Sequence, residues 1–261
     1  MNEKKNSVIA VIPAHMASVR FPGKILFNIH GLPMIEHVRR RALFAASLDD
    51  VYVATCDTQI EQAISGFGGK VIMTSDKHKN GSTRVAEAVT HLECTHVIVL
   101  QGDEPLMLPE HIDALVESIS HYAEADAWNA TGALEEEDEL DKHSFVKCSV
   151  TEENRILHCF RRSPCYSPFT VQQQFIRKIL GIFAFRKEFL LNLVSLPSSP
   201  IEMAEFIEQM RILENGFRMQ SVPVAPTLPS VNEPAEADII FNYLAERDEQ
   251  RELLERVLAF K

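Results

Sequence analysis

The first 120 residues or so alternate short apolar runs with segments of helical spacing, and this alternation is the feature that most constrains the fold. Apolar runs of this length are typical of strands buried on both faces of a parallel sheet. Strands that alternate with helices predict right-handed βαβ units, and therefore an α/β protein. The expected strands are Val8–Ile12, Val51–Thr55, Lys70–Thr74 and His96–Leu100, and the expected helices are Met34–Ala46, Gln59–Phe67, Thr83–Leu92 and Pro109–Ser120.

The rest of the chain has a different pattern, with several strand candidates and no full helix between them. We expect a mixed, β-rich middle section and a C-terminal part that packs back on the first half. The three expected sections are residues 1–125, 126–198 and 199–261. The expected elements are strands at Ala127–Leu134, Phe145–Thr151, Ile156–Arg162, Ile179–Arg186 and Arg218–Val224, a mobile loop at Ser163–Gln174, and single helices at Pro200–Glu214 and Pro234–Phe260.

Composition excludes several classes of protein. The net charge of −11 argues against a nucleic-acid partner, which would call for a basic face. No apolar run approaches the ~18 residues of a membrane span, and the polar start MNEKKNS leads directly into a strand. We therefore expect no membrane insertion, no signal peptide and a cytoplasmic location. The five cysteines form no CxxC pair, which favours free thiols over a disulfide framework or a zinc site.

The loop after the first strand carries two cations. The apolar run stops at Pro13, and Arg20 and Lys24 follow around Pro22-Gly23. Open α/β sheets bind ligands beyond the carboxyl ends of their strands, and two cations there can neutralise a phosphate chain. The GxxxxGK[ST] motif of P-loop NTPases is absent. Taken alone, the loop fits an ordinary basic turn equally well.

The segment QGDEP follows the strand His96–Leu100 and places Asp103 at the same edge of the sheet. A carboxylate beside a phosphate-binding loop is typical of Mg²⁺, which one or two acidic groups and phosphate oxygens hold together. The competing interpretation is a turn that simply closes the strand.

The segment NGSTR at residues 80–84 predicts a turn followed by a capped helix start. Backbone amides at such a helix end, with Ser82 and Arg84, are candidates for contact with an anionic ligand.

Five motifs in one order make the chain resemble the sugar-acid cytidylyltransferases, and within them the 3-deoxy-manno-octulosonate cytidylyltransferase (CMP-Kdo synthetase) family. The pattern IPAR-xxS-xRxPGK-xL of that family appears as IPAHMASVRFPGKIL, SG[ST]xR as NGSTR, and QGDEP unchanged. GIYGYR appears as GIFAFR and SPLExxExLEQLR as SPIEMAEFIEQMR. The resemblance covers nearly the whole chain. It implies a Rossmann-like nucleotide-diphospho-sugar transferase fold, with a mostly parallel sheet.

The resemblance also implies roles for individual residues. Arg20 and Lys24 would hold the CTP triphosphate and Asp103 the Mg²⁺, and these three are the expected catalytic residues. Further expected nucleotide contacts are Pro13, Ala14, His15, Ser82, Arg84 and Gln101. The expected sugar-acid contacts are Gln101, Arg161, Gly181, Glu208 and Gln209, and the expected second metal ligand is Asn232.

The chain departs from the family pattern at several of these positions. His15 replaces an arginine, and Asn232 replaces an aspartate that binds magnesium in the family, with Glu233 as a possible substitute. Ile179 and Phe183 stand where histidine and tyrosine are common in the sugar site. These departures argue against Kdo itself as the sugar, and against metal binding as strong as in the rest of the family.

The expected reaction is nucleotidyl transfer from CTP to the anomeric hydroxyl of a 2-keto-3-deoxy sugar acid, with release of pyrophosphate. The product would enter lipopolysaccharide or another surface glycan. Two alternatives stay open: the same chemistry on a modified octulosonate, another sugar acid or a phosphonate, and a CTP-binding paralogue without turnover. The resemblance further implies a homodimer that associates through the middle section.

Overall fold

The computed structural model describes residues 6–18, 20–231 and 233–260. The chain forms two compact units, one from residues 1–113 and 228–261 and the other from residues 114–227. These boundaries differ from those of the three expected sections. Residues 199–227 belong with the middle section, and only the last part of the chain returns to the first unit.

A parallel sheet of four strands forms the centre of the first unit. β1 (Val8–Ala14) pairs with β4 (Asp50–Thr55) on one side and β6 (His96–Leu100) on the other, and β5 (Lys70–Met73) pairs with β4. All five residues of β6 are buried, as are six of the seven in β1. The apolar runs therefore form strands covered on both faces, and the prediction of a parallel α/β sheet is confirmed.

Three helices connect these strands: α1 (Met34–Ala42), α2 (Thr58–Gly66) and α3 (Gly81–Val89). α4 (Pro109–His121) follows β6, and the hairpin of β2 (Asn28–Ile29) and β3 (Leu32–Pro33) precedes α1. α1 ends four residues before the expected Ala46. The reason is that the amides of Phe44 and Ala45 bond to carbonyls three residues back, which tightens and ends the helix.

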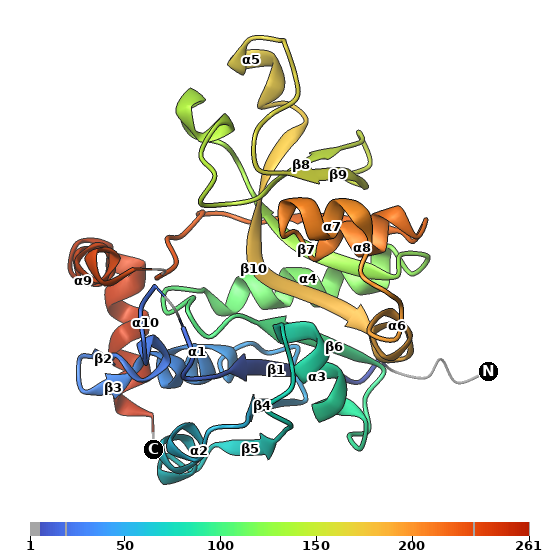
Figure 1. Cartoon of the computed structure of the whole chain (residues 1–261). Coiled ribbons are helices and arrows are strands. Elements are labelled where there is room, and N and C mark those ends of the chain that lie inside the picture. The colour runs from blue at the N-terminus through green and yellow to red at the C-terminus, as the bar shows by residue number, and fades with distance from the viewer. Residues whose placement is uncertain (1–5, 19, 232, 261) are drawn as a thin grey trace. The chain divides into compact units, whose positions relative to one another are not determined.

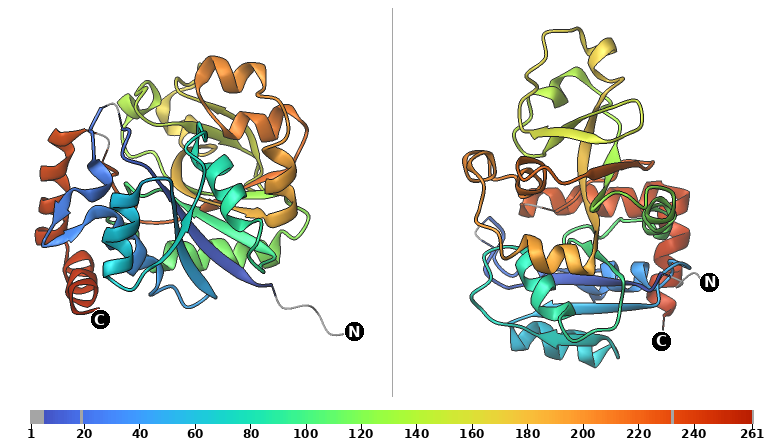
Figure 2. Two further views of the ribbon diagram at one scale, coloured as in Figure 1. Left: turned by 60° about the horizontal axis from the view of Figure 1, so that its bottom comes forward. Right: turned by 90° about the vertical axis from the view of Figure 1, so that its right-hand side faces the viewer.

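The tail is not the single helix that the charge pattern predicts. A 3-10 helix at Pro234–Glu236 leads into α9 (Ala237–Glu246), and α10 (Asp248–Ala259) follows after a break. The break lies at Arg247, whose φ of −96° and ψ of 118° are extended. α9 and α10 lie beside the β2–β3 hairpin in Figures 1 and 2, and Ile240, Leu244 and Leu254 pack there against Ile29.

The second unit contains a mixed sheet, as predicted. β7 (Ala127–Gly132) lies between β11 (Met219–Pro223), which is parallel to it, and β10 (Ile176–Arg186), which is antiparallel. β10 also pairs antiparallel with β8 (Lys147–Val150), and β8 with β9 (Ile156–Phe160). α5 (Phe169–Gln172) lies beyond the β8–β9 hairpin at one end of this unit (Figures 1 and 2).

The segment expected to be one helix at Pro200–Glu214 is two helices in this unit, so that prediction is wrong. α7 (Pro200–Glu205) and α8 (Gln209–Glu214) are separated at Phe206, which has a φ of 55°. Arg161 donates to the carbonyls of Glu205 and Phe206, at 2.9 and 3.3 Å. Its guanidinium therefore satisfies carbonyls that the broken helix leaves unpaired.

The segment Ser163–Gln174, expected to be a loop, contains a short helix and internal hydrogen bonds. It contains α5, and Gln172 is buried there beside Ser163, with 2.5 Å between Gln172 Oε1 and Ser163 Oγ. A final helix of this unit, α6 (Lys187–Leu193), follows β10 directly.

Candidate active site

A cavity of about 350 Å³ opens at the carboxyl ends of β1 and β6, the place where the fold class puts ligands. It brings together the two predicted loops, which are far apart in the sequence. Its lining consists of Pro13, Ala14, His15, Ala17, Ser18, Arg20, Lys24, Ile25, Gln101, Gly102 and Asp103. Seven of these residues are among the predicted nucleotide and metal contacts.

The shape of the first loop depends on Gly23. Gly23 has a φ of 71°, a conformation that costs glycine little, and its amide bonds to the carbonyl of Met16. A short 3-10 helix at Lys24–Leu26 starts there. Lys24 is therefore placed by backbone geometry at the cavity wall rather than on a free surface loop.

Lys24 and Asp103 form an ion pair in the cavity, with 2.5 Å between Lys24 Nζ and Asp103 Oδ2. The side chains are only 13% and 16% exposed, so solvent screens this pair weakly. Lys24 Nζ also donates to the carbonyl of Val231 at 3.1 Å, and the amide of Val231 donates to the carbonyl of Asp103. The C-terminal segment of this unit thus helps to hold both charged residues.

The two loops approach each other closely at Gly102. A methyl group on Gly102 would stand 2.9 Å from Cδ1 of Ile25, so the end of the Ile25 side chain would have to shift. The glycine of the motif QGDEP therefore packs directly against the residue that follows Lys24.

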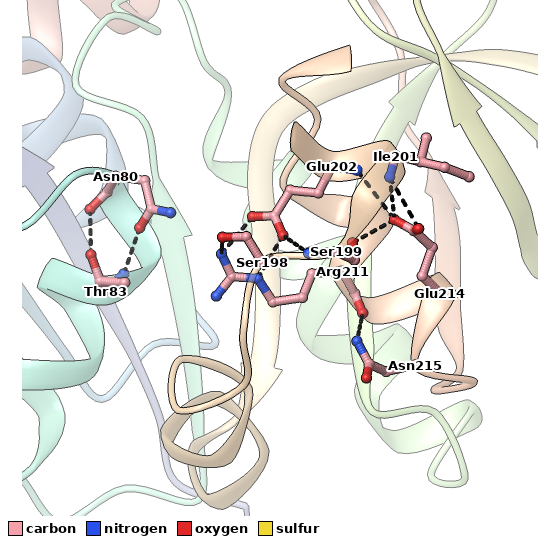
Figure 3. Close-up of polar contacts among 9 residues, drawn as sticks. All are labelled: Asn80, Thr83, Ser198, Ser199, Ile201, Glu202, Arg211, Glu214 and Asn215. Carbon is pink, nitrogen blue, oxygen red and sulfur yellow. Dashed lines mark hydrogen bonds and ion pairs between the residues drawn. The ribbon is translucent and has the colours of Figure 1, made fainter. Parts of the chain in front are cut away.

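The start of α3 lies next to Pro13, which lines the cavity: a methyl group on Gly81 would stand 3.1 Å from Cγ of Pro13. Asn80 caps the helix, since its Oδ1 accepts from the amide of Thr83 at 3.0 Å (Figure 3). Ser82 is 1% exposed, and its hydroxyl has no partner among the residues that the structure describes. Arg84 is also buried and donates to Thr74 Oγ1 at 2.6 Å, so it braces the end of β5. The predicted nucleotide contacts of Ser82 and Arg84 stay predictions.

His15 occupies the position of the family arginine without its permanent charge. Burial lowers the pKa of His15, the positive charges of Arg84 and Lys24 lower it further, and the carboxylate of Asp57 opposes this shift. Nδ1 of His15 accepts a hydrogen bond from the amide of Ala17 at 3.1 Å. The neutral imidazole is therefore the form at neutral pH, and it adds no cation to the cavity.

The donor set of the cavity fits a magnesium ion that a nucleotide brings with it. In residues 6–18, 20–231 and 233–260, no cluster of three or more histidine, cysteine or acidic side chains could hold a metal ion. Asp103 lines the cavity, and magnesium commonly takes one or two carboxylates and completes its shell with phosphate oxygens and water. The predicted second ligand, Asn232, lies outside the described residues. Glu233 uses its carboxylate to cap the following 3-10 helix.

The residues expected to contact the sugar acid lie in the second unit. Arg161 donates to the carbonyls of His143, Glu205 and Phe206, so all three of its nitrogens are engaged with the backbone. Gly181 lies in β10 between Ile179 and Phe183, where the pairing register with β7 shifts. Whether Arg161 and Gly181 bind the sugar stays a prediction.

Two of the expected sugar-acid contacts, Glu208 and Gln209, lie where α8 begins. Glu208 is the N-cap of that helix, and Gln209 is its first residue. Both side chains are half-buried. The amide nitrogen of Gln209 donates to Oδ1 of Asn129 at 3.2 Å.

A charged network that the sequence reasoning missed fixes α8 against α7 (Figure 3). Arg211 binds Glu202 through two hydrogen bonds of 2.5 and 2.8 Å, and Glu202 also caps its own helix at Ser199. Glu214 accepts from the amide of Ile201 at 3.1 Å. The only sequence signal was the Ser-x-x-Glu capping box at the start of SPIE.

No helix within the described parts of the chain is long and apolar enough to cross a membrane.

Comparisons with known proteins match the motifs and the fold. A family model described as cytidylyltransferase matches residues 9–221. The 3-deoxy-manno-octulosonate cytidylyltransferase of Escherichia coli is 37% identical over 88% of this chain and 93% of its own length. An 8-amino-3,8-dideoxy-manno-octulosonate cytidylyltransferase of Shewanella piezotolerans is 36% identical over 89% and 96%.

The solved structure of a CMP:2-keto-3-deoxy-manno-octonic acid synthetase complexed with CTP has the same fold. The TM-score is 0.86 at 35% identity, and the match covers 92% of this chain and 99% of that one. The family model spans well over half of this chain, and relatives of this identity extend over nearly all of it. The chain therefore belongs to the cytidylyltransferase family and is a nucleotidyltransferase.

Proposed function

We propose that the enzyme transfers CMP from CTP to the anomeric hydroxyl of 3-deoxy-manno-octulosonate and releases pyrophosphate. The observation that carries this proposal is the cavity at the ends of β1 and β6, where Lys24 and Asp103 meet. The similarity to octulosonate cytidylyltransferases supports an octulosonate as the acceptor.

In this proposal Arg20 and Lys24 bind the triphosphate and neutralise charge that builds up on the departing pyrophosphate. Both side chains line the cavity. Lys24 must leave Asp103 to do so, and a phosphate oxygen would replace the carboxylate as its acceptor. The backbone of Pro13 and Ala14 and the neighbouring Gln101 line the same cavity and can orient the base and ribose.

Asp103 is the residue that would hold magnesium together with the phosphates. The ion, when bound, supplies positive charge at the α-phosphate and lowers the pKa of the attacking hydroxyl. No covalent intermediate is needed, because the acceptor hydroxyl displaces pyrophosphate directly. Glu208 and Gln209 would bind the hydroxyl groups of the sugar acid, and Arg161 would lie near the carboxylate of the sugar acid.

The test is release of pyrophosphate from CTP and Kdo with Mg²⁺. We expect turnover by the wild-type enzyme and loss of it in Lys24→Met, with Lys70→Met as the control because Lys70 pairs with Asp50 outside the cavity. No pyrophosphate from any octulosonate, with CTP still bound, would contradict the proposal and favour a binding-only paralogue.

A second candidate acceptor is the 8-amino derivative of the same sugar. It is favoured by the Shewanella piezotolerans relative and by Ile179 and Phe183 in place of the usual histidine and tyrosine. The ratio of kcat/KM for the two sugars decides between them.

We also propose that two copies associate through the second unit. Tyr166, Met203 and Phe206 in this unit are exposed by 106%, 59% and 83%, which is unusual for large apolar side chains. A second copy that covers them would make a homodimer, and light scattering of the eluting protein measures its mass. Because CTP and its products are cytoplasmic metabolites, we place the enzyme in the cytoplasm, and cell fractionation tests this location.

A further inference from the structure

A buried amide in β7 has a single possible orientation. Asn129 is fully buried, and its Nδ2 lies 2.8 Å from the carbonyl oxygen of Ala130 and 2.9 Å from that of Leu180. The carbonyl oxygen of Ile182 is a third neighbour, at 3.4 Å. Carbonyl oxygens only accept hydrogen bonds, so the nitrogen must face them and Oδ1 must point the other way.

The reason for this arrangement is a distortion of the neighbouring strand. The register between β7 and β10 shifts between Ile179 and Phe183, so the strands do not pair evenly there. The side chain of Asn129 donates to the carbonyls of Leu180 and Ile182, which both lie within this irregular stretch of β10. Unsatisfied buried carbonyls are costly, and this requirement holds the Asn129 amide in place.

The orientation of Asn129 determines that of Gln209. Oδ1 of Asn129 lies 3.2 Å from Nε2 of Gln209, and an amide oxygen needs a donor opposite it. A reversed Gln209 amide would place oxygen against oxygen. The Nε2 group of Gln209 therefore stays on Asn129, and Oε1 is turned away from it.

The Oε1 atom of Gln209 remains available to a ligand. Gln209 is half-buried, and within the described residues its oxygen has no hydrogen-bond partner. Three backbone carbonyls in the sheet fix the orientation of Asn129, and Asn129 in turn fixes the orientation of the Gln209 amide. The helix that carries Gln209 does not determine it.

We propose that Asn129 is a positioning residue that makes Gln209 present its amide oxygen, as an acceptor, to a hydroxyl group of the sugar acid. This inference rests on the proposed function, because it requires that Gln209 faces the acceptor sugar. The group that Gln209 recognises is then a hydrogen-bond donor on the sugar, and not its carboxylate.

The kinetic test uses Asn129→Leu, which keeps the approximate volume and removes the amide. Without Asn129, nothing holds the Gln209 amide in the orientation that presents Oε1, so its hydrogen bond to the sugar is lost. We expect KM for Kdo to rise about tenfold, in the range of one lost hydrogen bond to a buried group. KM for CTP and kcat should change less than twofold. The control is Asn192→Leu, on the exposed face of α6, which should change neither constant. A KM for Kdo that is unchanged in Asn129→Leu, or equal losses for CTP and Kdo, would overturn the inference.

A second measurement does not depend on turnover or on the folding of the variant. In the wild-type protein, NMR should show side-chain amide hydrogens of Asn129 that exchange with solvent at least 100-fold more slowly than those of the exposed Asn192. One of the two amide hydrogens of Gln209 should also be protected. Equal exchange at Asn129 and Asn192 would refute the positioning role. A protected Asn129 in an enzyme that does not use Kdo would refute the proposed acceptor and leave the Asn129–Gln209 geometry standing.

Discussion

The pairing of Lys24 with Asp103 predicts that this enzyme binds a divalent cation weakly until the nucleotide arrives. Lys24 Nζ stands 2.5 Å from the carboxylate oxygen that would bind the metal, and a carbonyl of the C-terminal segment holds it there. Metal binding to the free enzyme must break this pair. Replacing Lys24 with methionine keeps an unbranched side chain, one atom shorter, and removes the charge, so Asp103 becomes available.

The magnitude follows from the geometry. A hydrogen bond between two charged groups contributes about 1.5–3 kcal/mol, and the low exposure of both side chains argues against the smaller values of surface pairs. A value of about 2 kcal/mol corresponds to roughly 30-fold in an equilibrium constant. We therefore expect Lys24→Met to bind Mn²⁺, a spectroscopic substitute for Mg²⁺, about 30-fold more tightly than the wild type in the absence of CTP.

The assay is a titration of Mn²⁺ followed by electron paramagnetic resonance at constant ionic strength, with and without CTP. The control is Lys70→Met, which removes the same charge from the surface and should not change the affinity. Asp103→Asn should abolish the gain in the Lys24→Met background. Equal Mn²⁺ affinities of wild type and Lys24→Met, or tight Mn²⁺ binding by the wild type without nucleotide, would refute the reasoning.

Three further predictions concern the core and the cavity. Burial lowers the pKa of His37 from 6.5 to about 4, so below pH 6.5 the unfolded chain takes up a proton that the folded chain excludes. The free energy of unfolding should therefore fall by about 2 kcal/mol between pH 8 and pH 5, and urea titrations should show that His37→Gln removes this loss; an unchanged pH dependence in the variant would contradict it. In Gly102→Ala the added methyl group meets Ile25, so calorimetry should show CTP affinity at least tenfold weaker, and wild-type affinity would disprove the packing argument. Burial raises the pKa of Cys148 to about 12 and that of Cys159 as well, so mass spectrometry of the native protein treated with iodoacetamide should find neither modified; rapid labelling of either would show that its strand opens.

Much of the first unit was predictable because its signals are local. A strand buried on both faces needs a run of apolar residues, and the runs at Val8–Ile12 and His96–Leu100 lie in β1 and β6. Parallel strands bring their carboxyl ends to one edge, so Lys24 and Asp103 were expected together, and they form an ion pair.

The errors concern breaks that local pattern does not encode. The apolar spacing of Pro200–Glu214 continues through Phe206, and it is Arg161, from another part of the chain, that satisfies the carbonyls at the break. The charged tail likewise has helical spacing through Arg247. There the change of direction lets α9 and α10 both pack in the first unit.

By itself the sequence determined the type of fold, the edge of the sheet that carries the cavity, and the family. The reason is that the spacing of apolar residues and the short motifs are local signals, which involve only a few neighbouring residues. Only the tertiary structure decided which partners those residues take. Lys24 forms an ion pair with Asp103, Arg161 donates hydrogen bonds to three carbonyls, and Gln209 donates one to Asn129. These contacts join residues 18 to 80 positions apart in a geometry that depends on strand register and helix ends, and no spacing along the chain specifies it.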